Sequence, residues 1–485
     1  MYPFGEVLST INKYILLISL ICYFQQNVYL IIGIFKKDKL YPIAKTNHRY
    51  GFIISARNEE IVIGNLIDSI FKQDYPKDLF HVFVVADNCT DNTAKVAREH
   101  GAIVYERFNE EERGKSFAID YLFKNIEKDY KDLNIEAYII FDADNLLDGN
   151  YTKEMNKAFD AGNKVVTSFR NSKNFDTNWI TAGSAFLFLR EARFVHHSRN
   201  ILNTSTYVSG TGFLIDAEII RKNGGWIHHT MIEDIEFSTD YISQGGYIAY
   251  QPTSIFYDEQ PSTLKATWNQ RMRWCRGTHH VFSLYFHKVL KGILKDLWKV
   301  IFLLPFFFGL YYISTILNWS FFKDPWSNIL KWTAVSLLSL ITSYVSIKVF
   351  KRRYANWDIA THIMPIPLIL FVWMCIFPVI YGIYAIIVKC PAAWWINASV
   401  FPIINSLGAI LCYAIFTALL IVIILKDKVK APLRKKILYS FAFPLYMFFY
   451  LPITLFALFK QIEWKPIVHD VNKTIENINE EKYTK

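Results

Sequence analysis

Charged residues are scarce in this sequence. Asp, Glu, Lys and Arg make up 20% of its 485 residues, against an average of about 25% in soluble globular proteins. Hydrophobic residues make up 52%, more than one water-soluble core can hide. They are concentrated between about 296 and 460, whereas residues 40–295 have an ordinary mixed composition. The sequence therefore predicts a soluble domain joined to a membrane region.

Cysteine is also rare. The six cysteines are isolated, and no two of them form a Cys-X-X-Cys pair. Zinc sites and disulfide frameworks both need cysteines at characteristic spacings, so the pattern argues against both. We interpret these cysteines as small apolar residues.

Acidic residues are fewer than basic ones, which leaves a formal net charge of +10. Nucleic-acid binding is one interpretation of such an excess. Much of the excess, however, lies beside apolar runs, in clusters at 36–39, 351–353 and 434–436. Cytoplasmic flanks of membrane helices have this arrangement. We therefore expect membrane lipid, and no nucleic acid, among the partners.

Tyr14–Phe35 is uncharged and reaches the length of about 20 residues that a membrane-spanning helix needs. It lacks the short apolar core and small-residue cleavage site of a signal peptide, so we expect an uncleaved anchor. Its C-terminal basic flank predicts that residue 36 onward is cytoplasmic. Further spans are expected at Val300–Phe322, Ile329–Phe350, Ile359–Val388, Ala398–Leu425 and Ile437–Phe459.

These patterns predict four parts. They are an anchor at 1–39, a cytoplasmic α/β domain at 40–295, a multi-span region at 296–462 and a polar tail at 463–485. The expected localisation is the plasma (inner) membrane, with several spans and the α/β domain on its cytoplasmic face.

Four short apolar runs in the α/β domain fit buried strands. They are Tyr50–Ile54, His81–Val85, Ala102–Tyr105 and Tyr138–Phe141, with helices expected at Ile61–Lys72 and from Asn92 to about His100. This alternation implies a mainly parallel sheet covered by helices. Ligands of such sheets bind beyond the carboxyl ends of the strands. Three of these ends carry polar clusters, at 57–60, 87–91 and 142–144, which predicts a ligand site there.

Asp142 and Asp144 follow an apolar strand with one residue between them. In a strand-end loop two such carboxylates can reach one divalent cation. Mg²⁺ and Mn²⁺ prefer oxygen ligands and often share them with phosphate, and the metal would neutralise a diphosphate leaving group. The alternative is a capped turn leading into Leu146–Gly149.

Two further segments have both a binding and a structural interpretation. Asp87 could hydrogen-bond a base or ribose, or it could cap the helix that begins near Asn92. Arg113 and Lys115 flank a glycine and could contact phosphate, although a solvated surface loop is the commoner role for such a triplet.

Glu233 and Asp234 follow an aromatic, glycine-rich segment. A carboxylate placed there could take the proton of an attacking hydroxyl group, and Asp234 is our candidate. The alternative is an acidic first turn of a helix.

The segment 270–277 is basic and aromatic and lies just before the expected late spans. Its three arginines could bind diphosphate, and Trp274 could stack on a sugar face. The alternative is an amphipathic interfacial helix that contacts lipid headgroups.

Together these residues resemble the membrane-integrated family 2 glycosyltransferases of the processive type, which include the cellulose, chitin, hyaluronan and poly-N-acetylglucosamine synthases. The resemblance runs from about Phe52 to Gly277. The family's first aspartate falls on Asp87, its DxD motif on Asp142 and Asp144, its Glu-Asp pair on Glu233 and Asp234, and its QxxRW motif on Gln270, Arg273 and Trp274.

The resemblance implies a GT-A-like, Rossmann-related α/β domain beside α-helical membrane spans. It also implies a UDP-sugar donor, Mg²⁺ or Mn²⁺, and an inverting single displacement onto a glycan or lipid acceptor. Asp234 is then the catalytic base, and Asp144 binds the metal. We assign donor binding to Arg57, Glu59, Asp87, Lys115, Asp142 and Asp144, and contacts to acceptor and diphosphate to Glu233, Gln270, Arg273 and Trp274.

Three functions remain open at this point. The first is extension of a polysaccharide, which the QxxRW motif favours. The second is transfer of one sugar to a lipid or short glycan. Departures from the family pattern, such as Ala86 where an aspartate is usual, bear on the choice between these two. The third is a transporter or membrane scaffold that only binds nucleotide, which would leave Asp234 without a purpose.

Overall fold

The computed structural model describes residues 26, 28–301, 379–380, 382–384, 386–387, 401–459, 469 and 471–480. The spans expected between Val300 and Phe350 lie almost wholly outside the described residues, as do most of Ile359–Val388 and of Tyr14–Phe35.

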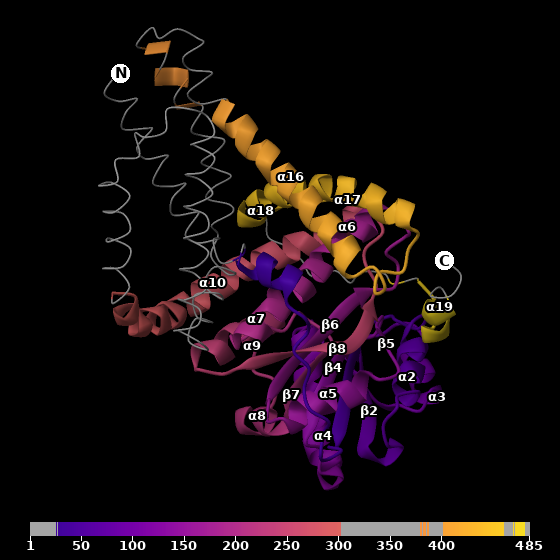
Figure 1. The fold of residues 1–485 in the computed structure, drawn as a ribbon. Helices are drawn as coiled ribbons and strands as arrows, with labels where there is room; N and C mark the ends of the chain where they lie inside the picture. The colour runs from indigo at the N-terminus through magenta and orange to yellow at the C-terminus, as the bar shows by residue number, and fades with distance from the viewer. Residues whose placement is uncertain are drawn as a thin grey trace.

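An eight-stranded sheet forms the centre of the α/β domain, in the order β3-β2-β1-β4-β7-β6-β8-β5 (Figure 1). Its first half is parallel and contains the four expected strands: β1 (Tyr50–Ala56), β2 (Phe80–Asp87), β3 (Ile103–Arg107) and β4 (Ala137–Asp142). Its second half comprises β5 (Leu146–Leu147), β6 (Val165–Ser172), β7 (Phe213–Asp216) and β8 (Ile248–Asp258).

The second half of the sheet adds antiparallel strands to the expected mainly parallel sheet, in which four of the seven strand pairs are parallel. Strand β7 runs antiparallel to both β4 and β6, and β5 runs antiparallel to β8. Only the β6–β8 pair in this half is parallel. The sheet is therefore mixed, and β7 reverses its direction beside β4.

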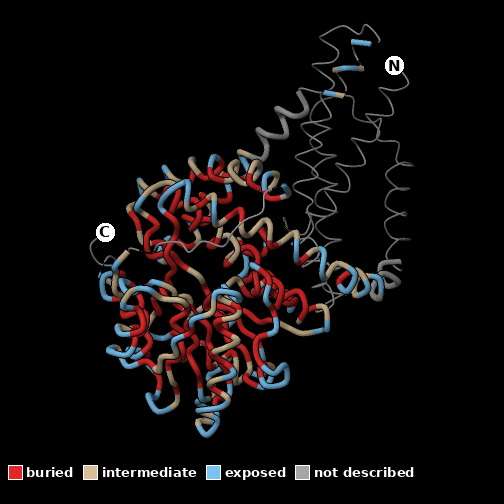
Figure 2. The backbone as a smooth tube through the Cα atoms, turned by 180° about the vertical axis from the view of Figure 1, so that it is seen from behind, coloured by how far each residue is buried: buried red, intermediate tan, exposed pale blue. Residues whose placement is uncertain are grey.

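Two hydrophobic clusters cover the two faces of the sheet, because successive side chains of a strand point to opposite faces. Ile53 of β1 packs on one face with α4 (Lys115–Asp129), α8 (Ala217–Asn223) and α9 (Glu233–Ser243). Its neighbours Phe52 and Ile54 pack on the other face. That face is covered by α2 (Ile63–Phe71), α3 (Thr93–Glu99) and α5 (Tyr151–Asp160). Figure 2 shows the buried residues concentrated in these layers.

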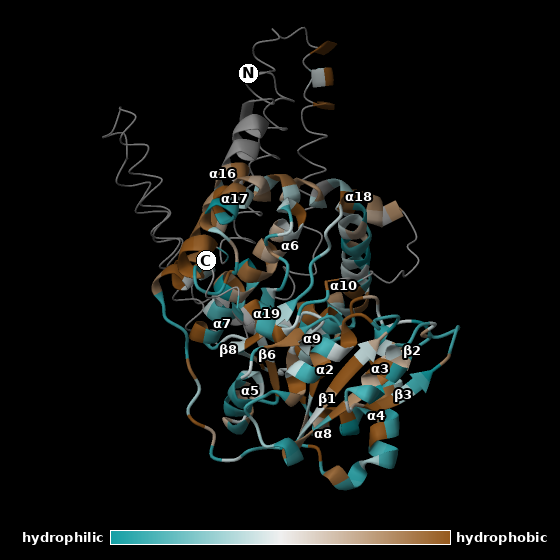
Figure 3. Ribbon diagram, turned by 90° about the vertical axis from the view of Figure 1, so that its right-hand side faces the viewer, coloured by the Kyte–Doolittle hydropathy of each residue, from teal (hydrophilic) through white to brown (hydrophobic). Residues whose placement is uncertain are grey.

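A third cluster joins the domain to the C-terminal helices. It packs α6 (Trp179–Arg190) against α16 (Phe401–Ile424) and α17 (Leu433–Phe448). Helix α6 continues into a π-helix, η3 (Glu191–His196), and then α7 (His197–Leu202). Hydrophobic residues line α16 (Figure 3).

The remaining helices include α10 (Leu264–Ile301), α18 (Tyr450–Phe459) and the short α19 (Ile475–Glu480), together with the 3-10 turns η1 (Lys77–Leu79) and η2 (Lys131–Leu133). Within the described part of the chain, one helical stretch, Leu433–Ala457, is long and apolar enough to cross a membrane. It overlaps the expected span at Ile437–Phe459. The expected span at Ala398–Leu425 is helical from Phe401 to Ile424, of which Leu411–Ile424 forms a shorter apolar helix.

Candidate functional site

The polar clusters meet at one edge of the sheet. Strands β1, β2 and β4 are parallel neighbours, with Ala56 beside Ala86 and Ser55 beside Asp142. The residues that follow these strands therefore lie at the same carboxyl edge. Asn58 and Asn88 have φ values of 57° and 52°, a left-handed conformation that asparagine tolerates. They turn the chain at this edge, between the half-buried Arg57 and the buried Glu59 in one case and directly after Asp87 in the other.

Asp87 is buried and paired. Its Oδ1 accepts a hydrogen bond of 2.7 Å from Nη1 of Arg107, and both side chains are almost inaccessible to solvent. The capping role is taken by Asp91, whose Oδ1 accepts from the backbone N of Thr93 at 3.0 Å. The interpretation of Asp87 as a helix cap is therefore wrong. Arg107, at the end of β3, was missed because only the sheet register places it opposite Asp87.

Lys115, the first residue of α4, lies between the end of β4 and the start of α9. Its Nζ donates to Asp142 and, at 2.7 Å, to the carbonyl oxygen of Gly210, and it lies 4.0 Å from Oε1 of Glu233. Burial alone would lower the pKa of Lys115, but Asp142 and Glu233 outweigh burial and raise it. Lys115 is therefore a half-buried cation, whereas Arg113 is half exposed and pairs with Glu110 at 3.4 Å.

Asp144 is in a different setting from Asp142. It is 4% exposed, and its carboxylate accepts from the backbone N of Glu259 at 3.1 Å and from the side chain of Asn145 at 3.4 Å. Among the described residues, no Lys, Arg or His nitrogen lies within ion-pair distance of it. Asp142 is already neutralised by Lys115. The geometry thus leaves Asp144 as the carboxylate of this pair whose charge a cation could balance.

The chemistry of this edge fits a hard divalent cation, since such ions prefer carboxylate oxygens and share them with phosphate. In the parts of the chain that the structure describes, no group of three or more His, Cys, Asp or Glu side chains is arranged to hold a metal by itself. A cation at Asp144 would therefore need ligands from the bound substrate or from water.

Glu233 and Asp234 begin α9, and Glu233 is buried while Asp234 is half-buried. Burial raises the pKa of both carboxyl groups, and the positive charges of Lys115 and Arg273 oppose that shift. A Cβ atom built on Gly210 would lie 3.7 Å from Oδ2 of Asp234. The Asp234 carboxylate thus faces the backbone of the glycine-containing loop 209–212.

Glu236, the third acidic residue in the first turn of α9, has a structural role. Its two oxygens accept from the backbone N of Thr230 at 2.8 Å and from the hydroxyl of Tyr285 at 3.0 Å. Glu233 and Asp234 also lie in the first turn of α9, where negative charge is favourable. Their helix-start role is therefore present, together with the contacts to Lys115 and Gly210.

The segment 270–277 lies on α10, and its residues point to different places. Arg271 is fully buried and donates at 2.8 Å to both Ser184 Oγ and the hydroxyl of Tyr446. These contacts join it to α6 and α17, while its Nε and Nη1 are buried and have no hydrogen-bond partner among the described residues. Diphosphate binding by the three arginines therefore stays a prediction.

The other residues of this segment stay close to the site. Arg273 acts electrostatically on Glu233 and Asp234. Oε1 of Gln270 is buried and has no hydrogen-bond partner among the described residues. The Trp274 ring stacks under the Arg271 guanidinium at 4.0 Å and meets Phe188 edge-on at 5.9 Å.

A buried polar network supports the site and was missed from the sequence. Asp258, the last residue of β8, accepts from Nη2 of Arg170 at 2.6 Å and from Asn145 at 2.8 Å. Thr211 accepts from the backbone N of Asp142 at 2.9 Å and donates to Asn145. Burial raises the pKa of Asp258, and Arg170 opposes that shift. The acidic end of β8 was an available signal that the sequence reasoning did not use.

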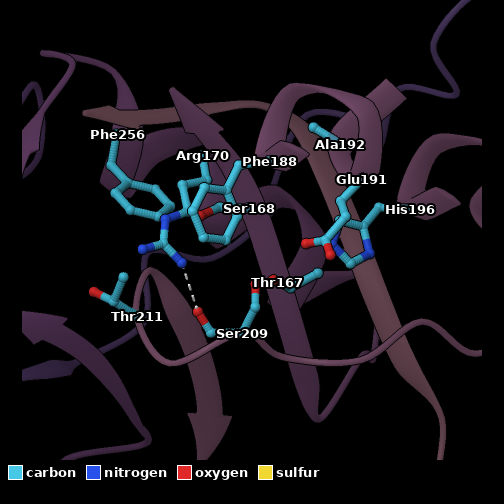
Figure 4. A pocket seen from close by; sticks show the side chains of 10 residues that line it. All are labelled: Thr167, Ser168, Arg170, Phe188, Glu191, Ala192, His196, Ser209, Thr211 and Phe256. Atoms are coloured by element: carbon cyan, nitrogen blue, oxygen red, sulfur yellow. Dashed lines mark hydrogen bonds between the residues drawn. The ribbon is translucent and has the colours of Figure 1, made fainter. Parts of the chain in front are cut away.

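Arg170 also lines a small cavity beneath the 209–212 loop (Figure 4). Its Nη1 donates to the carbonyl oxygen of Ser209 at 3.1 Å, and its guanidinium lies 3.7 Å from the centre of the Phe188 ring. Glu191 of the π-helix lines the same cavity, and burial raises its pKa. The cavity therefore lies between the 209–212 loop and the helices α6 and η3.

Residues 48–277 match the sequence model of a family described as "Glycosyltransferase like family 2". Among curated proteins, the chain is similar to the probable glycosyltransferase YdaM of Bacillus subtilis, with 27% identity over 299 residues, or 56% of this chain and 66% of that protein. It is also similar to the β-monoglucosyldiacylglycerol synthase of Nostoc, with 24% identity over 246 residues, or 50% of this chain and 51% of that protein.

A shorter match has a higher percentage identity. The 4,4'-diaponeurosporenoate glycosyltransferase of Staphylococcus aureus is 49% identical over 61 residues, which cover 12% of this chain and 16% of that protein. Overall, the chain spans between about half and two thirds of the length of the first two relatives.

Among solved structures, the chain is similar to the mannosyltransferase PcManGT from Pyrobaculum calidifontis, described in complex with GDP-Man and Mn²⁺. It has 18% identity and a TM-score of 0.43, and covers 73% of this chain and 97% of that one. TarS residues 1–349 of S. aureus has 16% identity and a TM-score of 0.35, and covers 65% and 90%.

Residues 48–277 are therefore a glycosyltransferase domain of the family 2 type, with a GT-A-like mixed α/β sheet. The expectation of a glycosyltransferase and of its α/β fold is confirmed for this domain.

Proposed function

We propose that the protein is an inverting glycosyltransferase that moves a sugar from a UDP-sugar donor to a hydroxyl group of a glycan or lipid acceptor, at the cytoplasmic face of the membrane. One observation carries the proposal. One half-buried cation, Lys115, bridges Asp142 on the proposed donor side to Glu233 beside the candidate base Asp234. The proposed donor carboxylates and the half-buried candidate base thus lie in one site.

The donor lies along the carboxyl edge of β1, β2 and β4 in this proposal. Asp87, fixed by Arg107, contacts the base or ribose, with Arg57 and Glu59 beside it. Mg²⁺ or Mn²⁺ on Asp144 would supply the positive charge that neutralises the diphosphate as it leaves. Lys115 holds Asp142 in place, while Gln270, Arg273 and Trp274 bind the diphosphate and the acceptor end. The buried Oε1 of Gln270 has no partner among the described residues, and as an acceptor it supports a contact with a hydroxyl group of the acceptor end.

The transfer step is a single displacement. The acceptor hydroxyl oxygen forms a bond to the anomeric carbon from the side opposite the diphosphate, and the bond from that carbon to the diphosphate oxygen breaks with inversion. Asp234 takes the hydroxyl proton. Burial raises the pKa of Asp234, which strengthens it as a base, while Lys115 favours the ionised form that the reaction needs. Gly210 leaves room for an acceptor beside the carboxylate.

The acceptor is either a growing glycan or a lipid. The QxxRW motif, carried by Gln270, Arg273 and Trp274, supports a growing polysaccharide. Transfer of one sugar to a lipid is the second candidate, and it is supported by two relatives whose names specify lipid products or substrates. The packing of α10 against α18 fits both acceptors, since it brings the acceptor-side residues next to an apolar helix.

Radiolabelled UDP-sugars incubated with membranes that contain the protein test this function. We expect metal-dependent release of UDP together with a labelled product. Label that stays with high-molecular-weight carbohydrate identifies a polymerase, and label that extracts into organic solvent identifies a lipid glycosyltransferase. Membranes carrying Asp144→Ala are the matched control. If no nucleotide sugar is consumed beyond that control, the protein is not a sugar transferase, and the nucleotide-binding scaffold becomes the better interpretation.

A further inference from the structure

The end of the chain returns to the donor edge. Residues 469 and 471–480, called here the tail segment, follow the apolar helices in sequence but lie beside α2 and β5 (Figure 1). The sequence predicted only a polar tail for this region. Its contacts with the domain are made by residues that are roughly 300 to 400 positions away in the chain.

The first contact is between His469 and Glu59. Nδ1 of His469 lies 2.9 Å and 3.1 Å from the two carboxylate oxygens of Glu59. Glu59 is also held by its backbone N, which donates to Thr93 Oγ1 at 2.8 Å. Burial would lower the pKa of His469, but Asp144 and Glu59 outweigh burial and raise it to about 10. At neutral pH His469 is therefore a cation at this acidic edge.

The second contact anchors the segment. Ile475 and Ile478, 8% and 1% exposed, pack against Leu146 and Tyr257. These two partners face each other in the β5–β8 ladder, and Leu146 comes two residues after Asp144. Ile475 and Ile478 therefore pack on the β5–β8 strand pair, and β5 directly follows the loop that contains Asp144.

A third contact joins the segment to Asp144 through charged side chains. Nζ of Lys173 donates to the carbonyl oxygen of Val471 at 3.2 Å and pairs with Glu259 at 2.8 Å. The backbone N of Glu259 in turn donates to Asp144. The tail segment thus touches Glu59 on one side of the donor edge and the Asp144 loop on the other.

We propose that the tail segment is a built part of the donor site, in which His469 positions Glu59 and supplies a positive charge that favours the nucleotide diphosphate. The inference rests on the proposed function. Its physical reason is charge: Glu59, Asp142, Asp144 and Glu259 gather at this edge, and a diphosphate is also an anion. Without His469, Glu59 would keep an uncompensated negative charge facing the donor.

Kinetics of the full-length chain carrying His469→Gln test the proposal. We expect the donor KM to rise about tenfold, the effect of losing one charge-assisted hydrogen bond, while kcat stays within about twofold, because Asp234 and the acceptor side are untouched. Glu476→Gln is the matched control. It removes a contact of the same segment with Lys72, but that ion pair is half exposed and contributes little, so its donor KM should equal that of the wild type.

Two further variants keep the test independent of folding. Ile478→Ala loosens the anchor without removing any charge, and should also raise the donor KM. Combining His469→Gln with Glu59→Gln should cost less than the sum of the single changes, because His469 acts through Glu59. Thermal unfolding of each variant shows whether it is folded.

Some results would overturn the inference. One is an unchanged donor KM in folded His469→Gln protein. Another is a defect that excess Mn²⁺ alone repairs, which would place His469 on the metal instead of on Glu59. If the wild type transfers sugar, either result removes this inference and leaves the proposed function standing. If the wild type transfers no sugar, the proposed function fails, and the inference fails with it.

Discussion

Nζ of Lys115 lies 4.0 Å from Oε1 of Glu233 and also donates to Asp142. One ammonium group therefore lies between two carboxylates, which are proposed to belong to the donor side and the acceptor side. Asp142 ends β4, Glu233 begins α9, and Lys115 reaches both from the first turn of α4. This arrangement makes the ionisation of the α9 carboxylates depend on Lys115, and the first prediction follows from that dependence.

Replacing Lys115 by Met should move the acidic limb of the pH–rate profile to higher pH. Burial raises the pKa of Asp234, and the Lys115 charge opposes this shift by favouring the carboxylate. Without that charge the pKa rises further, so the base stays protonated up to a higher pH and the rate at low pH falls. The measurement is kcat/KM against pH. Lys115→Arg keeps the charge and is the control. An unchanged acidic limb in the Met variant would remove Lys115 from this role.

Replacing Asp144 by Ala should reduce sugar transfer at least about 100-fold, since a catalytic metal is worth several kcal/mol. The wild-type enzyme should lose activity in a chelator and regain it with Mg²⁺ or Mn²⁺. Asp148→Ala removes a carboxylate from the following turn and should leave the metal dependence unchanged. Full activity of Asp144→Ala in excess chelator would contradict the metal role.

Replacing Arg107 by Met should destabilise the domain by about 3–5 kcal/mol, the usual effect of leaving one partner of a buried ion pair alone. The Asp87 carboxyl group would lose its ion-pair partner at a position that is 3% exposed. Arg98→Met is the control, because its pair with Glu106 is about half exposed and contributes at most about 1 kcal/mol. Denaturant unfolding of both purified variants gives the comparison, and equal losses of stability would contradict the account of Asp87.

A cysteine at position 110 should resist a membrane-impermeant thiol reagent in intact cells and react after permeabilisation. Glu110 has an 87% exposed side chain, so access to this loop depends only on the side of the membrane. The basic flank after Phe35 predicts that this loop is in the cytoplasm. Efficient labelling of intact cells would reverse the proposed topology.

The parallel half of the sheet was predictable because each of its strands is an apolar run that ends in polar residues. Strands β1, β2, β3 and β4 begin and end within about two residues of the prediction. The second half was not predicted, since β8 contains the polar residues Gln251, Thr253 and Ser254 and β5 has only two residues. Their pairing depends on partners that are distant in sequence.

The candidate site shows the same division. The residues at the ends of β1, β2 and β4 could be placed together from the alternation of strands and helices alone. Their partners Arg107 and His469 could not be predicted, because they reach Asp87 and Glu59 only through the folded arrangement. The same holds for Arg170, which pairs with Asp258 at the end of β8. The contacts of Arg271 with Ser184 and Tyr446 could not be predicted either, because both partners are distant from it in sequence.

Donor binding and sugar transfer, measured together on purified Asp234→Asn protein, test the central claim most directly. The substitution keeps the shape of the side chain and removes its basicity. The account predicts donor affinity close to that of the wild type and transfer reduced about 10²- to 10⁴-fold, the contribution of a well-placed general base. A helix-start role alone predicts a stability loss of about 0.5–2 kcal/mol, with transfer per folded molecule nearly unchanged. Transfer within a few fold of wild type would therefore contradict the account and leave Glu233 as the next candidate for the base.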